Sequence, residues 1–196
     1  MLNYRANGKL LLTSEYAITQ GAKGLALPAR FGQKIHYFPN LEANSISWSS
    51  LDHDAQEWFW AEISLSLEVI RTSNEKVAKR LLKNLQIVKS HSSLLDKPGS
   101  FKTELEFPAE WGLGTSSTFT SLLAQCAQVD PLETFKNAHG GSGYDLACAK
   151  ADGPITYQLI ENKAKVLNTT IPFDFLDELG FVYRGKKQLT SESLNL

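Results

Sequence analysis

At residues 108–117 the sequence reads PAEWGLGTSS, which joins a strand-like segment to a helix-like segment. Residues 101–107 alternate apolar and polar side chains, as in a half-buried strand. Apolar residues at helical spacing follow the motif: Phe119, Leu122, Leu123 and Cys126. Gly112 and Gly114 allow positive φ angles and close backbone approach, so the amides of the first helical turn can bind a small anion such as phosphate.

The hydroxyls of Ser116 and Ser117 follow these glycines, where they can cap the helix or bind a metal ion carried by the phosphate. Taken alone, the motif is equally compatible with an ordinary strand-to-helix turn that has a Thr or Ser N-cap, and both interpretations stay open. The motif lacks the GK[ST] ending of a Walker A loop and the spacing of GxGxxG, so these two nucleotide-binding classes are excluded.

The composition is that of a globular protein with one good-sized domain, or one domain and part of another. The 196 residues are 42% hydrophobic and 21% charged, with 20 basic and 21 acidic side chains. The sequence has no dense Lys/Arg stripe, so nucleic acid is not expected as a partner. Neither a signal peptide nor a membrane span is indicated, which predicts a cytoplasmic protein. Cys126 and Cys148 fit no metal or disulfide spacing.

Two opposite charges flank one predicted strand near the N-terminus. Residues 10–13 form this strand, which we expect to follow a turn at Asn7-Gly8-Lys9. Lys9 then lies at one end of the strand, and Glu15 lies just past the other. The two side chains can face one pocket, although charges that flank a strand are also commonly just solvated.

A second glycine-rich segment, HGGSGYDLACA at residues 139–149, surrounds a single carboxylate with three glycines. Such a turn delivers Asp145 to the start of a helix of small residues, where a ligand can approach closely. Asp145 is therefore a candidate general base, with a simple helix cap as the alternative. The four histidines share no ligand spacing: His36, His53, His91 and His139.

The remaining elements are predicted from periodicity and turn residues. Aromatic and β-branched residues between Asn, Asp and Ser clusters predict antiparallel strands at 35–38, 45–48 and 57–63. We assign their aromatic residues to the core rather than to a surface that stacks on bases or sugars: Trp48, Trp58, Phe59 and Trp60.

Helices and a hairpin complete these assignments. The capping box Thr72-Ser73-Asn74-Glu75 predicts a helix that continues at helical spacing to Val88. Further predictions are a helix at 132–138, a hairpin of 155–160 and 165–167 with its turn at 161–163, a strand at 181–183 and a helix cap at 190–193.

Three segments in this order resemble the GHMP kinases, which include galactokinase, homoserine kinase, mevalonate kinase and phosphomevalonate kinase. The segments are NGKLLLTSEYAITQGAKGLALP at 7–28, PAEWGLGTSS at 108–117 and GGSGYDLACA at 140–149. Within that superfamily, Gly143-Tyr144-Asp145 looks like the bacterial group named for a GYDIA motif, which is similar to mevalonate and phosphomevalonate kinases.

The resemblance implies a role for each matching residue. It implies that ATP phosphates are bound by Gly112, Leu113, Gly114, Thr115 and Ser116, with Ser117 as adjacent support. It implies that Asp145 accepts the proton of the substrate hydroxyl and that Lys9 lowers the pKa of that hydroxyl and steadies the transferred phosphoryl group. The acid of the first motif matches Glu15, and the implied substrate contacts are Glu15, Ser142, Gly143 and Tyr144. The implied Mg²⁺ ligands are Ser116 and, as a weaker match, Glu133.

The resemblance also implies an α+β fold: a mixed, mostly antiparallel sheet with helices packed on one side, like a ribosomal-protein domain. Residues 1–167 correspond to the N-terminal ATP-binding domain, and residues 168–196 to the start of an incomplete, ferredoxin-like C-terminal domain. The glycine-rich third motif of the family is absent, so we expect a truncated or shortened form of a longer kinase. Ser14 replaces the glycine that usually precedes the first-motif acid, a change we expect to be tolerated if its φ is negative.

The expected function is ATP- and Mg²⁺-dependent transfer of a γ-phosphoryl group to a small-molecule hydroxyl, with mevalonate in isoprenoid biosynthesis as the expected substrate. Phosphomevalonate kinase and diphosphomevalonate decarboxylase stay open as alternatives. From another class, a non-catalytic, truncated binding module with this fold also stays open. No membrane partner is expected, and a homodimer is left open.

Overall fold

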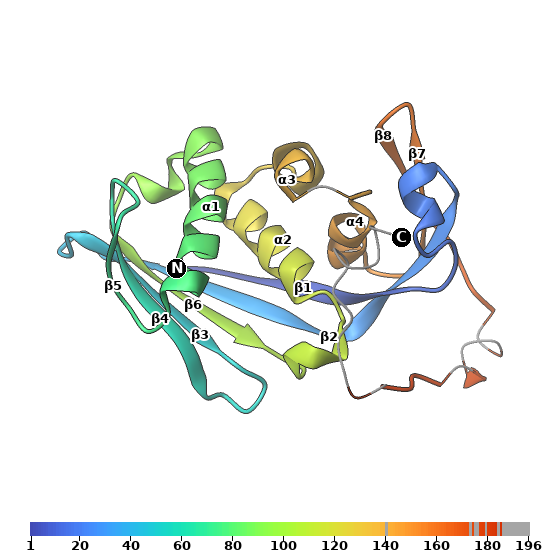
Figure 1. The fold of residues 1–196 in the computed structure, drawn as a ribbon, viewed down its shortest axis with the longest axis horizontal. Coiled ribbons are helices and arrows are strands. Elements are labelled where there is room, and N and C mark those ends of the chain that lie inside the picture. Colours follow the sequence, from blue (N-terminus) through green and yellow to red (C-terminus); the bar gives the residue numbers. More distant parts are fainter. Residues whose placement is uncertain (140, 173, 175–176, 179, 184, 186–196) are drawn as a thin grey trace.

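The computed structural model describes the chain except residues 140, 173, 175–176, 179, 184 and 186–196. An eight-stranded sheet forms one layer, and the α-helices pack on one of its faces (Figure 1). The strands are β1 (Leu2–Leu11), β2 (Gly24–Pro39), β3 (Ser45–Leu51), β4 (Glu57–Ser64), β5 (Val69–Thr72), β6 (Gly99–Leu105), β7 (Ile155–Ile160) and β8 (Lys163–Asn168). The helices are α1 (Glu75–His91), α2 (Thr115–Ala127), α3 (Pro131–His139) and α4 (Tyr144–Lys150). The predicted α+β class is thus confirmed.

The sheet has the order β5-β4-β3-β6-β2-β7-β8, and β1 pairs with the long strand β2. All of these pairs are antiparallel except β3 with β6, which is parallel. Because β2 is 16 residues long, it pairs with β7 near its start and with β6 near its end. This strand therefore connects the two ends of the sheet, and β1 follows it along most of its length.

Helix α2 lies at the centre of the helical layer and is buried along most of its length. Leu122, Leu123 and Ala124 are fully buried. On the sheet side, Phe101 stacks on Tyr37 and Trp48, with ring centroids 4.5 Å and 5.0 Å apart. The start of α2, which contains the PAEWGLGTSS motif, is therefore fixed to the sheet by the packing of the rest of the helix.

Helix α1 is present as predicted, but it begins two residues later than the capping box implies, because Asn74 rather than Thr72 is its N-cap. The side chain of Asn74 accepts hydrogen bonds from the amides of Lys76 (3.1 Å) and Val77 (3.2 Å). The predicted helix at 132–138 is confirmed as α3, and the predicted hairpin as β7 and β8. At the hairpin turn Glu161 and Asn162 both have positive φ, 49° and 62°, as a tight two-residue turn requires.

Two of the four aromatic residues assigned to the core are on the surface instead. Trp48 and Phe59 are buried, but Trp58 and Trp60 are 55% and 39% exposed. Successive side chains of a strand point to opposite faces of the sheet, and only one face of β4 is covered by helices. Phe59 points to the covered face, so Trp60 points to the open one. Trp58 lies where the pairing of β3 with β4 is irregular, and it stays exposed at that edge.

Two local predictions near the ends of the chain are wrong. Asn7-Gly8-Lys9 is not a turn that precedes a strand but part of β1 itself, where the pairing with β2 is irregular. Phe181–Tyr183 is not a strand, and its side chains are exposed. A three-residue strand without a paired neighbour is not stable. The helix cap predicted at 190–193 lies outside the described residues.

No helix in the described part of the chain is long and apolar enough to cross a membrane.

Candidate active site

The PAEWGLGTSS motif forms an open loop that ends in the N-terminus of α2. A short 3₁₀ turn, Ala109–Trp111, is followed by Gly112 (φ 75°) and Gly114 (φ 89°), both in the left-handed region that favours glycine. Gly114 is the N-cap of α2, and no side chain caps the helix. The first amides of a helix have no intrahelical acceptor. The helix start therefore presents free donors and a partial positive charge to an anion.

The serine hydroxyls of this motif do not cap α2, which rules out the ordinary Ser or Thr N-cap left open above. Ser117 is buried and donates to the Gly114 carbonyl at 2.8 Å. Thr118, also buried, donates to Oε1 of Gln33 at 2.8 Å. Ser116 is exposed in the first turn, so its hydroxyl is accessible to a ligand bound at the helix start.

Lys9 lies against this loop. Its amide donates to the Leu113 carbonyl at 2.9 Å, and its ammonium donates to the Tyr144 hydroxyl at 2.7 Å. A Cβ atom on Gly114 would lie only 2.9 Å from Cγ of Lys9. Lys9, the loop and the start of α4 are far apart in sequence, and the fold brings them together.

Tyr144 and two nearby carboxylates keep the ammonium of Lys9 charged. Burial alone would lower the pKa of Lys9, but Tyr144, Asp145 and Glu15 together outweigh this effect and raise the pKa above its usual value. Burial also raises the pKa of Tyr144, against the opposing effect of Lys9. At neutral pH the pair is therefore an ammonium that donates to a neutral phenol, with Asp145 and Glu15 supplying the nearby negative charge.

Asp145 lies in the first turn of α4, half-buried, and is not the cap of that helix. Gly143 (φ 82°) is the N-cap, without a side-chain cap. One Asp145 oxygen, Oδ1, accepts the amide of Leu146 at 3.1 Å. Ser142 is buried, its carbonyl accepts the Tyr157 hydroxyl, and its Oγ accepts the Tyr144 amide at 3.4 Å. The helix-cap alternative for Asp145 is thus wrong.

Glu15 and its neighbour follow β1 in an exposed turn. The condition that we set for Ser14 fails, because its φ is 67° rather than negative. The Ser14 hydroxyl donates to the Lys23 carbonyl at 2.7 Å, which helps to hold this unfavourable conformation. Glu15 is exposed, and its contribution to the site is the charge that it presents to Lys9 and Tyr144.

The magnesium ligands stay a prediction. Glu133 is exposed in the first turn of α3, where its amide donates to the capping Asp130 at 3.0 Å. Among the residues that the structure describes, no group of three or more His, Cys, Asp or Glu side chains is arranged to hold a metal ion. Ser116 is well placed only as a ligand of a metal that arrives with an anion at the helix start.

A cavity of about 550 Å³ adjoins the same helix start and was not foreseen from the sequence. It lies between α1, the strands β3, β4 and β6, and the beginning of α2. Its walls include Trp48, Phe59, Asn84, Thr115, Ser116 and Phe119. This volume is in the range of small-molecule pockets. The cavity thus lies beside Thr115 and Ser116 of the loop. Lys9 lies beside Leu113 and Gly114 of the same loop.

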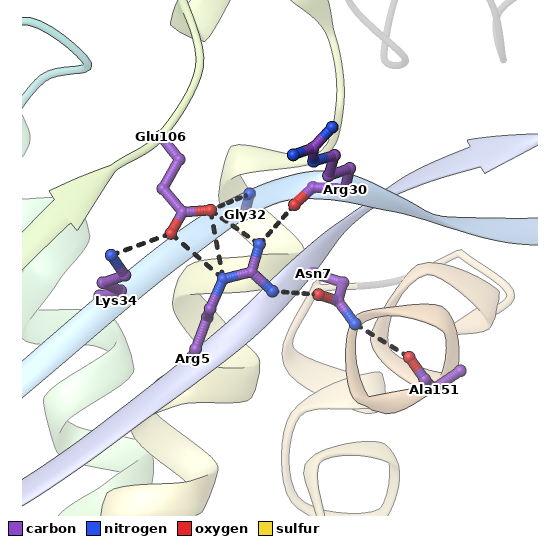
Figure 2. A network of polar contacts seen from close by, with 7 residues as sticks. All are labelled: Arg5, Asn7, Arg30, Gly32, Lys34, Glu106 and Ala151. Atoms are coloured by element: carbon purple, nitrogen blue, oxygen red, sulfur yellow. Dashed lines mark hydrogen bonds and ion pairs between the residues drawn. The ribbon is translucent and has the colours of Figure 1, made fainter. Parts of the chain in front are cut away.

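A network of polar contacts links the strands and helix that carry these residues (Figure 2). Glu106, just after β6, accepts from Arg5 Nη2 at 2.7 Å, from the Gly32 amide at 2.8 Å and from Lys34 Nζ at 3.2 Å. Hydrogen bonds from Arg5, Lys34 and Gly32 hold the pKa of the Glu106 carboxyl at about 2.

Glu106→Gln is expected to reduce the loss of stability at acidic pH. The pKa in the folded state, about 2, lies below the ordinary 4.5. The stabilisation is therefore complete above the unfolded-state pKa and is lost as the pH falls from about 5 to about 2. Urea unfolding across this range should show a shallower pH dependence for the variant. Exposed Glu68 supplies the control, Glu68→Gln; an equal slope in Glu106→Gln and wild type would contradict the assignment.

No protein-family model and no curated protein sequence matches the chain. Solved structures do match it. Phosphomevalonate kinase from Streptococcus pneumoniae, in complex with phosphomevalonate and AMPPNP, matches with a TM-score of 0.58 and 18% identity over 81% of this chain and 50% of that chain. Mevalonate kinase from Methanococcus jannaschii matches with a TM-score of 0.60 and 15% identity over 86% and 56% of the two chains. Galactokinase from Lactococcus lactis, complexed with galactose, matches with a TM-score of 0.58 and 14% identity over 84% and 46%.

These similarities define the class of fold. The chain has the fold of the GHMP kinases, and the resemblance seen in its three motifs is confirmed at this level. It spans about half the length of the kinases that it matches.

Proposed function

We propose that this protein is an ATP-dependent kinase that transfers a phosphoryl group to the hydroxyl of a small molecule. One observation carries the proposal: the fold brings Lys9, the uncapped start of α2 and the Asp145-bearing start of α4 together. Phosphoryl transfer requires positioning and charge neutralisation rather than a covalent intermediate, and these groups supply both. Residues 1–167 would form the ATP-binding domain.

The nucleotide would bind across the loop. Its phosphates fit the free amides from Gly112 to Ser116, and its base and ribose fit the neighbouring cavity beside Phe119. Ser116, with Glu133 as a second candidate, would hold Mg²⁺. When bound, the metal neutralises phosphate charge.

The acceptor would bind between α4 and Lys9. Asp145 would accept the hydroxyl proton, and the Lys9 ammonium would stabilise negative charge on that oxygen and on the transferred group. The acceptor would contact Ser142, Gly143 and Tyr144, which directly precede Asp145 at the start of α4. Glu15 adds negative charge that keeps Lys9 protonated.

Mevalonate is the proposed acceptor, with phosphomevalonate as the next candidate and a diphosphomevalonate decarboxylase as a related alternative. The support is the GYDLA motif together with the similar mevalonate and phosphomevalonate kinases. A galactokinase shares the fold, so fold alone does not choose the acceptor.

Calorimetry and a substrate panel test the proposal. We expect the protein to bind Mg-ATP and to phosphorylate mevalonate in preference to phosphomevalonate, homoserine and galactose. Carbon dioxide release from diphosphomevalonate would identify the decarboxylase. Binding of Mg-ATP without turnover would favour a non-catalytic module, and absence of Mg-ATP binding would overturn the assignment of the loop.

A further inference from the structure

The pairing of β1 with β2 is interrupted directly before Lys9. Asn7 pairs with Gly32, but Lys9 pairs with Pro28, so β2 has two more residues than β1 between these pairs. An irregularity of this kind bends the strands and changes the direction of nearby side chains. Gly8 sits inside it, and a Cβ atom there would lie 2.8 Å from the Phe31 carbonyl oxygen. The direction of Lys9 therefore depends on how this bulge is held.

The side chain of Arg5 stabilises the bulge through contacts with β2 and with Glu106. Its Nη2 donates to the Arg30 carbonyl at 2.6 Å, within the extra residues of β2. The same guanidinium binds the Glu106 carboxylate, which also accepts the amide of Gly32 at the edge of the bulge. Glu106 leads into the phosphate-binding loop through Phe107, which is fully buried. One side chain thus links the bulge to the start of the loop.

Asn7 extends this link to α4. Its Oδ1 accepts from Nη1 of Arg5, and its Nδ2 donates to the Ala151 carbonyl at 2.9 Å (Figure 2). Ala151 is the C-cap of α4, whose first turn carries Asp145. A seven-residue helix is only about 10 Å long, so a movement at its C-terminal end is transmitted to its first turn.

We propose that Arg5 and Asn7 are positioning residues, which set the placement of Lys9 relative to Asp145 through the bulge and the end of α4. Neither residue is assigned a contact with ATP or the acceptor. The proposal rests on the proposed kinase function for its kinetic test, and on the Lys9–Tyr144 contact for a test that needs no activity.

Asn7→Asp isolates the connection to α4. The two side chains have nearly the same shape, and aspartate still accepts from Arg5. An ionised aspartate has no hydrogen to donate to the Ala151 carbonyl. Arg5→Gln removes the guanidinium that bridges Arg30 and Glu106.

Arg71→Gln is the matched control. Arg71 binds Glu62 through Nε at 3.0 Å and Nη2 at 2.7 Å, on strands β5 and β4. It is likewise an arginine–carboxylate pair, but no hydrogen bond or ion pair among the described residues connects it to Lys9 or α4.

Steady-state kinetics of the full chain with Mg-ATP and mevalonate give the first measurement. Small displacements of reacting groups lower the rate steeply, so kcat should fall about 10- to 100-fold in Asn7→Asp and Arg5→Gln. In Asn7→Asp the KM for ATP should stay within about twofold, because the contact that this variant loses lies at the end of α4 and not at the loop before α2. Arg71→Gln should keep the wild-type kcat. A merely structural loss of folded protein would lower the active fraction in proportion to the melting transition, which is measured in parallel.

Tyrosine ¹³Cζ NMR of the free protein gives the second measurement, with Tyr144→Phe used to assign the resonance. The chemical shift and titration of Tyr144 report its contact with the Lys9 ammonium. Both should change in Asn7→Asp and Arg5→Gln but not in Arg71→Gln. An unchanged Tyr144 signal in both variants would overturn the inference whatever the kinetics show. An inactive wild type with changed Tyr144 signals would overturn the proposed function and leave the positioning role supported.

Discussion

Asp145→Asn is expected to lower kcat for phosphoryl transfer by about 10²- to 10⁴-fold, the range found for loss of general acid–base catalysis. Asparagine keeps the size of the side chain and its acceptor for the Leu146 amide, which Asp145 Oδ1 binds at 3.1 Å. It cannot accept the hydroxyl proton. Because the loop proposed to bind the phosphates does not involve Asp145, the Kd for Mg-ATP should stay within about twofold of the wild-type value.

Asp152→Asn is the control, since Asp152 is an exposed carboxylate just beyond α4 and should tolerate the change. Lys9→Ala should produce a loss of similar size. The losses in the double variant should be far from additive, because both residues act on one transition state. Near-normal turnover in Asp145→Asn would show that Asp145 is not the base.

The sequence predicts well the parts of the molecule where one local pattern is sufficient. The start of helix α1 and the hairpin turn after Ile160 are decided by neighbouring residues, although the cap is Asn74 rather than Thr72 and the turn has two residues rather than three. The glycine positions of the PAEWGLGTSS loop are of the same kind: Gly112 and Gly114 have the positive φ angles that the motif requires. The meeting of Lys9 with the segment that carries Asp145 was expected from the combined motifs, and the structure supplies the contact through Tyr144.

The parts that the sequence could not predict depend on which elements become neighbours. Phe59 and Trp60 are adjacent and similar, and only the placement of the helices over one face decides that Phe59 is buried. The cavity is likewise assembled from strands and helices distant in sequence. Asn7-Gly8 is a strong turn signal, but these residues lie within the long pairing of β1 with β2, where they form an irregularity instead of a turn.

Gly114→Ala is expected to weaken Mg-ATP binding by at least about tenfold. A non-glycine residue in the left-handed region costs about 1–2 kcal/mol, and about 1.4 kcal/mol corresponds to a tenfold change in Kd where the unstrained loop is needed for binding. Steric clashes of the new methyl group are expected to weaken binding further. A Cβ atom at position 114 would lie 2.6 Å from Ser117 Oγ and 2.9 Å from Lys9 Cγ. Relief of either clash moves a residue of the site itself.

Gly112→Ala separates the effect of backbone strain from the effect of the steric clashes. Gly112 has a similar φ of 75°, so alanine there meets a comparable backbone strain, but its Cβ atom would have no neighbour within 4 Å in the described part of the chain. Calorimetric titration with Mg-ATP should therefore show a clearly smaller loss of affinity for Gly112→Ala than for Gly114→Ala. Equal losses would mean that backbone strain alone governs the loop. Unchanged affinity in Gly114→Ala would mean that the phosphates bind elsewhere, because no phosphate-bearing ligand can use the amides of Thr115 and Ser116 without the conformation that Gly114 permits.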